Sequence, residues 1–329
     1  LRVGLFHWPR YDLRLAPVST TYLDLTYHEN VDILVPEDDV ECSLVFIHHP
    51  PILGHAIDAL PAIRTKSVAI LVNQLPKQRH SQAPFYYDMA DVDAFCTERF
   101  GSAPTWLPIA PHVYDILCAT GPSSIISTDI GSPPYNGELA TEISPPADLG
   151  TERPIVIGRH ARSHWTKWPA SPAAIRAAYC ADTKGVETRI LGGATEPEQR
   201  LGGIPGNWSV LPFDSVGVSE FLAGLDFCVH YIHPDYIEEF GRNIMEAMAA
   251  SRVVILPKSF SAIFGDAAVY ASPDAVSDTA RSLWADPAAY RAQAERGLEF
   301  VRKRCGRKAV RYRLRTLIPE KRQPLESVS

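Results

Sequence analysis

Glu238 and Glu246 are carboxylates eight positions apart, and the residues around them could place both on one ligand. Gly241 follows the first acid, and a residue without a Cβ lets the backbone approach a ligand closely. Strong helix formers, Glu-Ala-Met-Ala-Ala at 246–250, surround the second acid. We expect a helix that begins near Gly241 and directs free N–H groups and its positive dipole end at an anion. One acid near the loop and one along the helix suit a nucleotide sugar, whose phosphates would sit at the helix start.

The whole stretch resembles the E-x7-E signature of retaining GT-B glycosyltransferases of the glycosyltransferase family 4 type, because Phe240-Gly241 and the residues flanking the second acid match as well as the spacing. The resemblance implies that Glu246 binds the ribose of a donor nucleotide and that Glu238 contacts the donor sugar. It also implies that the amides after Phe240-Gly241, at Arg242 and beyond, hold the diphosphate. An amphipathic helix with surface glutamates is the plainer interpretation, and it ranks lower.

A basic loop at 158–169 follows a predicted strand and could supply cations to that diphosphate. Members of the resembled family have a Gly-Arg pair and a later Lys that reach the diphosphate, which implies these roles for Arg159 and Lys167. The spacing here is longer than usual, so Arg162 is a rival for either role. Arg and Lys beside phosphate oxygens can stabilise a leaving nucleotide without a metal. An ordinary basic surface loop is the alternative.

Three pairs of residues could suggest a metal site, and we reject all three. The histidine pairs His160–His164 and His230–His233 each lack a third ligand in register. Asp91-Val92-Asp93 matches the D-x-D motif of metal-dependent GT-A transferases, where the motif ends a strand. Here it precedes a predicted strand over 94–97 and is interpreted as a helix-to-strand turn. We therefore expect no metal and no cofactor beyond the donor substrate.

Polar residues at strand ends in the N-terminal half are candidates for the acceptor side. His48 and His49 end one predicted strand, although a hydrogen-bonded structural histidine is the preferred interpretation of His49. A later strand ends at Asn73 and Gln74, where many members of the resembled family have a histidine. His7 stands where the family's Gly-Gly loop is usual. Both departures leave the acceptor side less well matched than the donor side.

The order of elements predicts an α/β protein with parallel sheets. The resemblance implies the GT-B fold, that is, two Rossmann-like parallel-sheet domains facing across a cleft. Short apolar runs alternate with helical stretches in both halves, and Gly192-Gly193 end one strand of the second half, where they could line the donor site. The predicted divisions are an acceptor-side domain (1–117), a Pro/Gly-rich linker (118–153), a nucleotide-sugar domain (154–306) and a basic C-terminal helix or tail (307–329).

Composition limits the classes of partner. The 329 residues are 46% hydrophobic and 21% charged, with a net charge of −6, which argues against nucleic acid. Scattered cysteines and the absence of a long apolar run favour a cytoplasmic protein. Residues 291–322 hold twelve Lys or Arg against three Glu, so peripheral contact with the anionic inner face of a membrane is an alternative to a solvated helix.

Taken with these observations, the resemblance implies a retaining, metal-independent glycosyltransferase of the hexosyltransferase type (EC 2.4), as in polysaccharide biosynthesis. The expected donor is a nucleotide-diphosphate sugar carrying UDP or GDP, and the expected acceptor is a saccharide or a lipid-linked molecule. A non-catalytic nucleotide-sugar-binding partner of another transferase is one alternative. A nucleotide-sugar epimerase or a phosphorylase on the same architecture is another.

Overall fold

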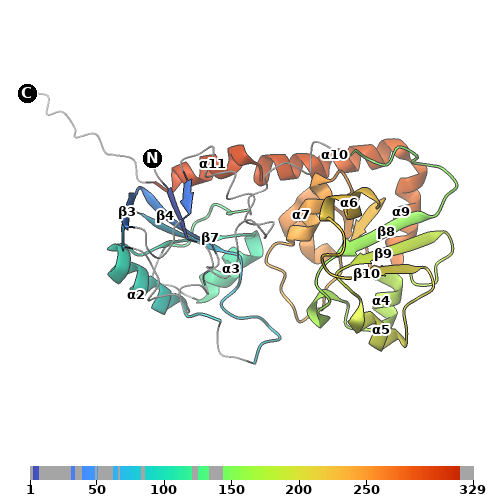
Figure 1. Cartoon of the computed structure of the whole chain (residues 1–329), viewed down its shortest axis with the longest axis horizontal. Coiled ribbons are helices and arrows are strands. Elements are labelled where there is room, and N and C mark those ends of the chain that lie inside the picture. Colours follow the sequence, from blue (N-terminus) through green and yellow to red (C-terminus); the bar gives the residue numbers. More distant parts are fainter. Residues whose placement is uncertain are drawn as a thin grey trace, which may run out of the picture. The chain divides into compact units, whose positions relative to one another are not determined.

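The computed structural model describes residues 3–6, 31–33, 39–48, 50, 62–65, 67–82, 86–120, 125–132 and 144–318. The chain forms two compact units (Figure 1), which are described separately here. Unit 1 comprises Leu1–Lys77, Ala83–Pro134 and Arg307–Ser329, and unit 2 comprises Gln78–Gln82 and Tyr135–Gly306. Each unit therefore contains segments that are distant in the sequence.

Unit 1 contains a five-stranded parallel sheet with the order β2-β1-β4-β6-β7. Its strands are β1 (Val3–Phe6), β2 (Val31–Ile33), β4 (Leu44–His48), β6 (Val68–Val72) and β7 (Thr105–Pro108). A separate parallel pair joins β3 (Asp39–Cys42) to β5 (Ala62–Thr65). Every residue of β6 is buried, as expected for a parallel strand that is covered on both faces.

Within the described residues of unit 1, the helices are α2 (Met89–Phe100), α3 (Pro111–Thr120) and the C-terminal α11 (Arg307–Thr316). The α11 segment is held by two hydrogen bonds, from Ser67 Oγ to Leu317 O at 2.9 Å and from Arg313 Nη1 to Ser132 O at 3.1 Å. Val310 and Leu314 give this basic helix an apolar, buried side. The chain thus returns to unit 1 after it has completed unit 2.

The strand predicted over 94–97 is wrong, because these residues lie inside helix α2. The Asp88 side chain caps the helix start by accepting from the amides of Ala90 and Asp91, and Gly101 ends the helix in the left-handed region with a φ of 74°. The buried side chains of α2 are Met89, Val92, Asp93, Cys96 and Phe100, which have helical spacing. Asp93 accepts a hydrogen bond from Trp106 Nε1 at 2.8 Å in the core.

Unit 2 contains a six-stranded parallel sheet with the order β10-β9-β8-β11-β12-β13. Its strands are β8 (Ile155–His160), β9 (Val186–Leu191), β10 (Trp208–Leu211), β11 (Phe227–Val229), β12 (Val253–Leu256) and β13 (Val269–Tyr270). In chain order this is 3-2-1-4-5-6, the order of the doubly wound dinucleotide-binding fold. The order reverses between β8 and β11, and in such sheets ligands bind beyond the carboxyl ends of the strands at that point.

Helices cover both faces of this sheet. Figure 1 shows α4 (Pro172–Ala178) and α9 (Val276–Ala285) on one side, and α6 (Val218–Ala223) and α7 (Arg242–Ala249) on the other. The remaining helices are α5 (Thr195–Leu201), α8 (Ser261–Phe264), α10 (Pro287–Arg304) and four single turns, η4 (Trp165–Lys167), η5 (Lys258–Phe260), η6 (Gly265–Ala267) and η7 (Pro273–Ala275). A cluster of aromatic and aliphatic side chains from β8, β9, β11, α4 and α9 forms the core of the α4 side.

The predicted α/β class with two parallel sheets is confirmed. The short strands β3 and β5 and helix α5 were not predicted. Within the described ranges, no helix is both long and apolar enough to cross a bilayer.

Candidate functional site

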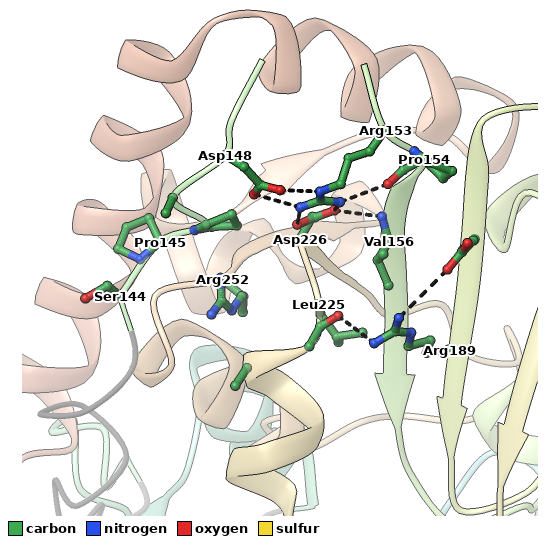
Figure 2. A pocket seen from close by; sticks show the side chains of 15 residues that line it. Ser144, Pro145, Asp148, Arg153, Pro154, Val156, Arg189, Leu225, Asp226 and Arg252 are labelled. Atoms are coloured by element: carbon green, nitrogen blue, oxygen red, sulfur yellow. Dashed lines mark hydrogen bonds and ion pairs between the residues drawn. The ribbon is translucent and has the colours of Figure 1, made fainter. Parts of the chain in front are cut away.

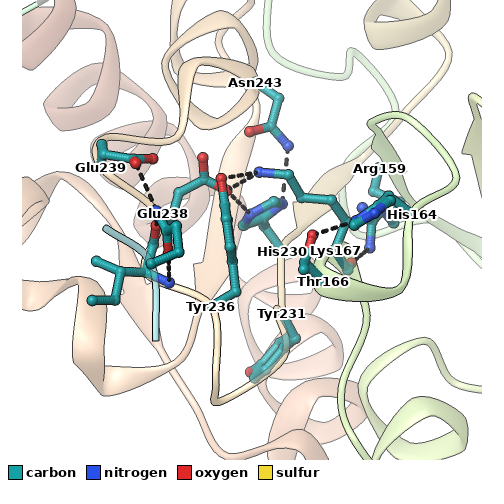
Figure 3. A network of polar contacts seen from close by, with 12 residues as sticks. Arg159, His164, Thr166, Lys167, His230, Tyr231, Tyr236, Glu238, Glu239 and Asn243 are labelled. Atoms are coloured by element: carbon teal, nitrogen blue, oxygen red, sulfur yellow. Dashed lines mark hydrogen bonds and ion pairs between the residues drawn. The ribbon is translucent and has the colours of Figure 1, made fainter. Parts of the chain in front are cut away.

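The candidate site lies in unit 2 at the carboxyl ends of β8 and β11, where the strand order reverses (Figure 3). Strand β8 ends at His160, and His230 follows directly after β11. The loop after β11 contains Glu238 and leads into α7, which carries Glu246. The sheet therefore brings together two histidines and the two glutamates that the sequence singled out.

Glu238 is held by a lysine and faces a histidine. Its Oε2 lies 2.5 Å from Lys167 Nζ and 3.5 Å from His230 Nε2. The Lys167 ammonium also lies 4.4 Å from the centre of the Tyr236 ring. Burial opposes ionisation of Glu238, but the charge of Lys167 and the contact with His230 outweigh it and lower the pKa of this carboxyl to about 2. Glu238 is therefore a carboxylate at any physiological pH.

Glu246 is bound by two other basic side chains. His160 Nε2 lies 2.8 Å from Oε2, and Arg242 Nε, one helical turn earlier, lies 3.0 Å from Oε1. Burial opposes its ionisation too, but the hydrogen bond from His160 and the charge of Arg242 hold its pKa below the usual value. A carboxylate only accepts hydrogen bonds, so His160 Nε2 carries a proton in this contact. Each glutamate thus has its own pair of basic partners.

Asn243 joins the two halves of this network. Its Nδ2 lies 3.2 Å from His160 O and 2.9 Å from His230 Nδ1. His230 is 0% exposed, and burial lowers the pKa of its ring to about 4, so the imidazole is neutral at pH 7. The ion pair at Glu238 is therefore formed by Lys167, and His230 contributes a neutral ring.

The first backbone amides of α7 are not capped by a side chain, and an anion-binding helix start needs such free amides. No side chain caps the helix start, and Gly241 precedes it with a φ of 88°. A Cβ on Gly241 would lie 2.6 Å from Ile244 Cδ1, so a larger residue would meet both strain and a clash. Phe240 is buried against Phe264, which anchors the loop before the helix.

A short segment of the first half of the sequence, Gln78–Gln82, belongs to unit 2 and supports the Glu238 loop. Gln78 is 4% exposed; its Nε2 donates to Ile237 O at 3.0 Å and to Glu239 Oε1 at 2.7 Å. Its Oε1 accepts from Ile237 N at 3.0 Å. One side-chain amide therefore binds the residues on both sides of Glu238. The ring of His80 packs against Trp165 and Tyr236 close by.

The Arg159 side chain is buried in the structure, and its predicted contact with a diphosphate stays a prediction. Consecutive side chains of a strand point to opposite faces, so Arg159 and His160 diverge. The Arg159 guanidinium is fully buried on the α4 side, where it stacks 4.1 Å from the Trp168 ring and donates to Lys167 O and Tyr179 Oη. Its Nε and Nη2 have no hydrogen-bond partner among the described residues, and the neighbouring His160 reaches Glu246.

The other donor-side candidates lie in loops near the site. Arg162 is exposed in the loop after β8. Gly192 and Gly193 follow β9 with φ values of 108° and 87°, and a Cβ on Gly192 would lie 2.0 Å from Ala161 O. These glycines allow the loops after β8 and β9 to approach each other. Their predicted contact with a ligand stays a prediction.

The acceptor-side candidates belong to unit 1, and the predicted roles stay predictions. Asn73 and Gln74 follow β6, and His48 is the last residue of β4. His7 and His49 lie outside the described residues.

Sequence reasoning missed Gln78 and Asn243, and it considered His160 and His230 only as metal ligands. For His160 the available signal was strand alternation next to Arg159. In the described part of the chain, no cluster of three or more His, Cys, Asp or Glu could hold a metal.

A second polar cluster lies at the opposite, amino edge of the same sheet, beside a cavity of about 530 Å³ (Figure 2). Arg153 there binds Asp226 through two contacts of 2.7 and 2.8 Å, and it also contacts Asp148. None of the residues predicted for the site lines this cavity.

No protein-family model matches the chain, and no curated protein matches its sequence. Solved structures do resemble it. HepE from Anabaena, in complex with UDP-glucose, matches with a TM-score of 0.65 at 12% identity, over 96% of this chain and 98% of that chain. WaaG, a glycosyltransferase involved in lipopolysaccharide biosynthesis, matches with a TM-score of 0.59 at 11% identity, over 97% and 100%. Sucrose-phosphate synthase from Thermosynechococcus elongatus gives 0.56 at 16%, over 94% and 79%. The chain therefore has the GT-B fold.

Proposed function

We propose that this chain is a retaining, metal-independent glycosyltransferase of the glycosyltransferase family 4 type, a hexosyltransferase (EC 2.4). The observation that carries the proposal is the pairing of Glu238 and Glu246 with separate basic partners at the switch point of the unit 2 sheet. Complexes of the structural neighbours with UDP and UDP-glucose support the nucleotide-sugar chemistry. The proposed donor is a UDP or GDP sugar.

Glu246 is the proposed ribose ligand. His160 and Arg242 each engage one of its oxygens, so the carboxylate is ionised and fixed in orientation before a ligand arrives. An ionised carboxylate accepts hydrogen bonds from two neighbouring hydroxyl groups, which is the pattern that a ribose presents. Preorganisation lowers the entropy that binding costs.

The departing diphosphate would bind at the start of α7. Free amides and the helix dipole at Arg242 and Asn243 attract its negative charge. Lys167 and Arg162 are the proposed side-chain cations. Cations that are already in position can stabilise the charge that develops on the leaving group, which is the task a metal performs in other transferases.

In the proposed reaction, the bond between the sugar C1 and the diphosphate oxygen breaks as a bond forms between C1 and an acceptor hydroxyl oxygen. The acceptor proton passes to the leaving phosphate oxygen on the same face of the sugar, so the configuration at C1 is retained. Glu238 orients the sugar, and its ion pair with Lys167 lies beside the sugar. No cofactor takes part in this proposal.

The test is a calorimetric titration with UDP, GDP, ADP and TDP in chelator-treated buffer. We expect selective binding of UDP or GDP, a loss of at least about tenfold in affinity in Glu246→Ala, and no change in Glu220→Ala, which removes an exposed glutamate. Equal affinity of the Glu246 variant and the wild type would contradict the ribose assignment. Binding without transfer to any acceptor would favour a non-catalytic partner, and conversion of the donor sugar alone would favour an epimerase.

The proposed acceptor is a saccharide or a lipid-linked molecule, reached in the cytoplasm or at the inner face of a membrane. The basic helix α11 supports peripheral membrane contact. Lys308, Arg311 and Arg315 are exposed at helical spacing beside Tyr312, which is 73% exposed. Sedimentation with vesicles that contain anionic lipid should carry the protein down at low salt, and Lys308→Glu with Arg315→Glu should abolish this. Equal sedimentation with neutral vesicles would contradict an electrostatic contact.

A further inference from the structure

Asn243 lies between two groups that restrict what its amide can do. His160 O, 3.2 Å away, is a backbone carbonyl and only accepts hydrogen bonds. The amide nitrogen of Asn243 must therefore be the atom that faces it. The same nitrogen lies 2.9 Å from His230 Nδ1, so its second N–H points at that ring atom (Figure 3).

This arrangement decides the tautomer of His230. An Nδ1 that accepts a hydrogen bond has a lone pair and no proton, so the proton of the neutral ring is on Nε2. Nε2 lies 3.5 Å from Glu238 Oε2, the oxygen that also binds Lys167. The ring is fully buried, and water cannot compensate a wrong tautomer.

We infer that Asn243 is a positioning residue, which holds His230 as the neutral Nε2–H tautomer so that Glu238 faces a donor. The inference rests on the proposed role of Glu238 toward the donor sugar. In the opposite tautomer a nitrogen lone pair would face the carboxylate oxygen, and the repulsion would displace Glu238. Asn243 acts through His230 and touches none of the reacting atoms with its side chain.

The direct test is the nitrogen NMR spectrum of the full chain labelled with 15N-histidine, with His230 assigned by the signal lost in His230→Gln. Chemical shifts of ring nitrogens distinguish protonated from unprotonated atoms. We expect a protonated Nε2 and an unprotonated Nδ1 at pH 7. A wild-type His230 that carries its proton on Nδ1, or protons on both nitrogens, would overturn the inference without any variant.

Asn243→Asp is the sharpest variant, because a carboxylate of the same shape only accepts hydrogen bonds. We expect Nδ1 of His230 to become protonated, and kcat for sugar transfer to fall on the order of 100-fold, as for a small misplacement of a reacting group. Affinity for UDP should fall as well, because the new charge lies at the start of α7, where the diphosphate is proposed to bind, so the protonation of His230 is the deciding readout. An unprotonated Nδ1 in this variant would contradict the inference.

Two further variants separate this role from general damage to the fold. Asn207 is a comparable amide whose Nδ2 donates to Cys180 O at 2.8 Å and Val186 O at 2.9 Å, away from the site. Asn207→Asp should lower stability but leave the His230 resonances unchanged. Asn243→Leu should give a mixture of tautomers with an intermediate kcat, and wild-type kcat would count against the positioning role. If wild-type protein binds no nucleotide, the proposed function fails, whatever the tautomer of His230.

Discussion

The two edges of the unit 2 sheet both carry buried carboxylates with basic partners, but the two clusters differ in how completely they are satisfied. At the amino edge, Asp226 accepts from both terminal nitrogens of Arg153 and from Val156 N at 2.8 Å (Figure 2). Hydrogen bonds to Asp226 and then to Asp148 raise the pKa of Arg153 above its usual range. This bidentate ion pair joins the start of β8 to the start of β11.

The carboxyl edge is built from similar groups, but some of its hydrogen-bonding groups are not fully paired. Within the part of the chain that the structure describes, His160 Nδ1 has no hydrogen-bond partner, His230 Nε2 has only the long 3.5 Å contact with Glu238 Oε2, and no side chain caps α7. Buried polar groups are normally satisfied, so such exceptions are expected where a ligand or strain is part of the function. The comparison indicates that an acid next to a base is not by itself a site. Arg252 Nη1 at the amino edge is also buried without a hydrogen-bond partner, so the distinguishing feature of the carboxyl edge is that its unpaired groups lie beside the uncapped start of α7.

The largest expected effect is on stability, at the amino edge. Asp226→Ala leaves the buried Val156 amide without its acceptor and Arg153 with only its exposed contact to Asp148, and we expect a loss of about 3 kcal/mol in the free energy of unfolding. Asp148→Ala is the control; its side chain is about half exposed, and we expect a loss of about 0–1 kcal/mol. Urea unfolding measures both. Equal losses of stability in the two variants would show that the buried Asp226 contributes no more than the half-exposed Asp148.

The next effect is on catalysis, at the carboxyl edge. Glu238→Gln keeps the shape of the side chain and removes its charge, so we expect sugar transfer to fall about 100- to 1000-fold. UDP affinity should change little, since the charge of Glu246 and its partners remains. Steady-state transfer assays and calorimetry check the two parts. Wild-type transfer in this variant would remove Glu238 from the mechanism.

Gln78→Ala should have a smaller effect on stability and on transfer, and it tests how the carboxyl edge is supported. The variant loses the amide that binds Ile237 and Glu239, and we expect a cost of about 1–3 kcal/mol in stability together with weaker transfer. Gln82→Ala, an exposed change in the same segment, is the control. Thermal unfolding and transfer assays measure both. Unchanged transfer in Gln78→Ala would show that the Glu238 loop holds itself in place.

The smallest effect is a pH dependence at His230. Its pKa falls from 6.5 to about 4 on folding, so between these values the unfolded chain binds more protons and stability falls as pH falls. From pH 7 to 5.5 this group should contribute a loss of about 1 kcal/mol, since each unit of difference in pKa corresponds to 1.4 kcal/mol. Urea unfolding of the wild type and of His230→Gln at both pH values isolates the contribution of His230 to the free energy of unfolding. Parallel pH profiles would contradict a buried neutral ring.

Local sequence patterns predicted the parallel α/β class and the loop and helix around Glu238 and Glu246, because strand and helix periods and the glycine before α7 are local signals. The same reasoning failed at 94–97. The buried positions Met89, Val92, Cys96 and Phe100 have helical spacing, and the short apolar run between them resembled a strand. The helical spacing of apolar residues over the 12 residues of α2 indicates the observed structure better than the short apolar run does.

The packing of unit 2 determines which side chains join the two glutamates. Strand alternation shows that Arg159 and His160 point to opposite faces, but the order of the strands and the position of α7 determine which face carries the site. Gln78 lies 159 positions before Ile237, and no local period records such a pairing. Local sequence patterns indicate the acids, their spacing and the helix that carries one of them. The basic partners depend on long-range packing, because residues far apart in the chain meet only when the sheet has formed.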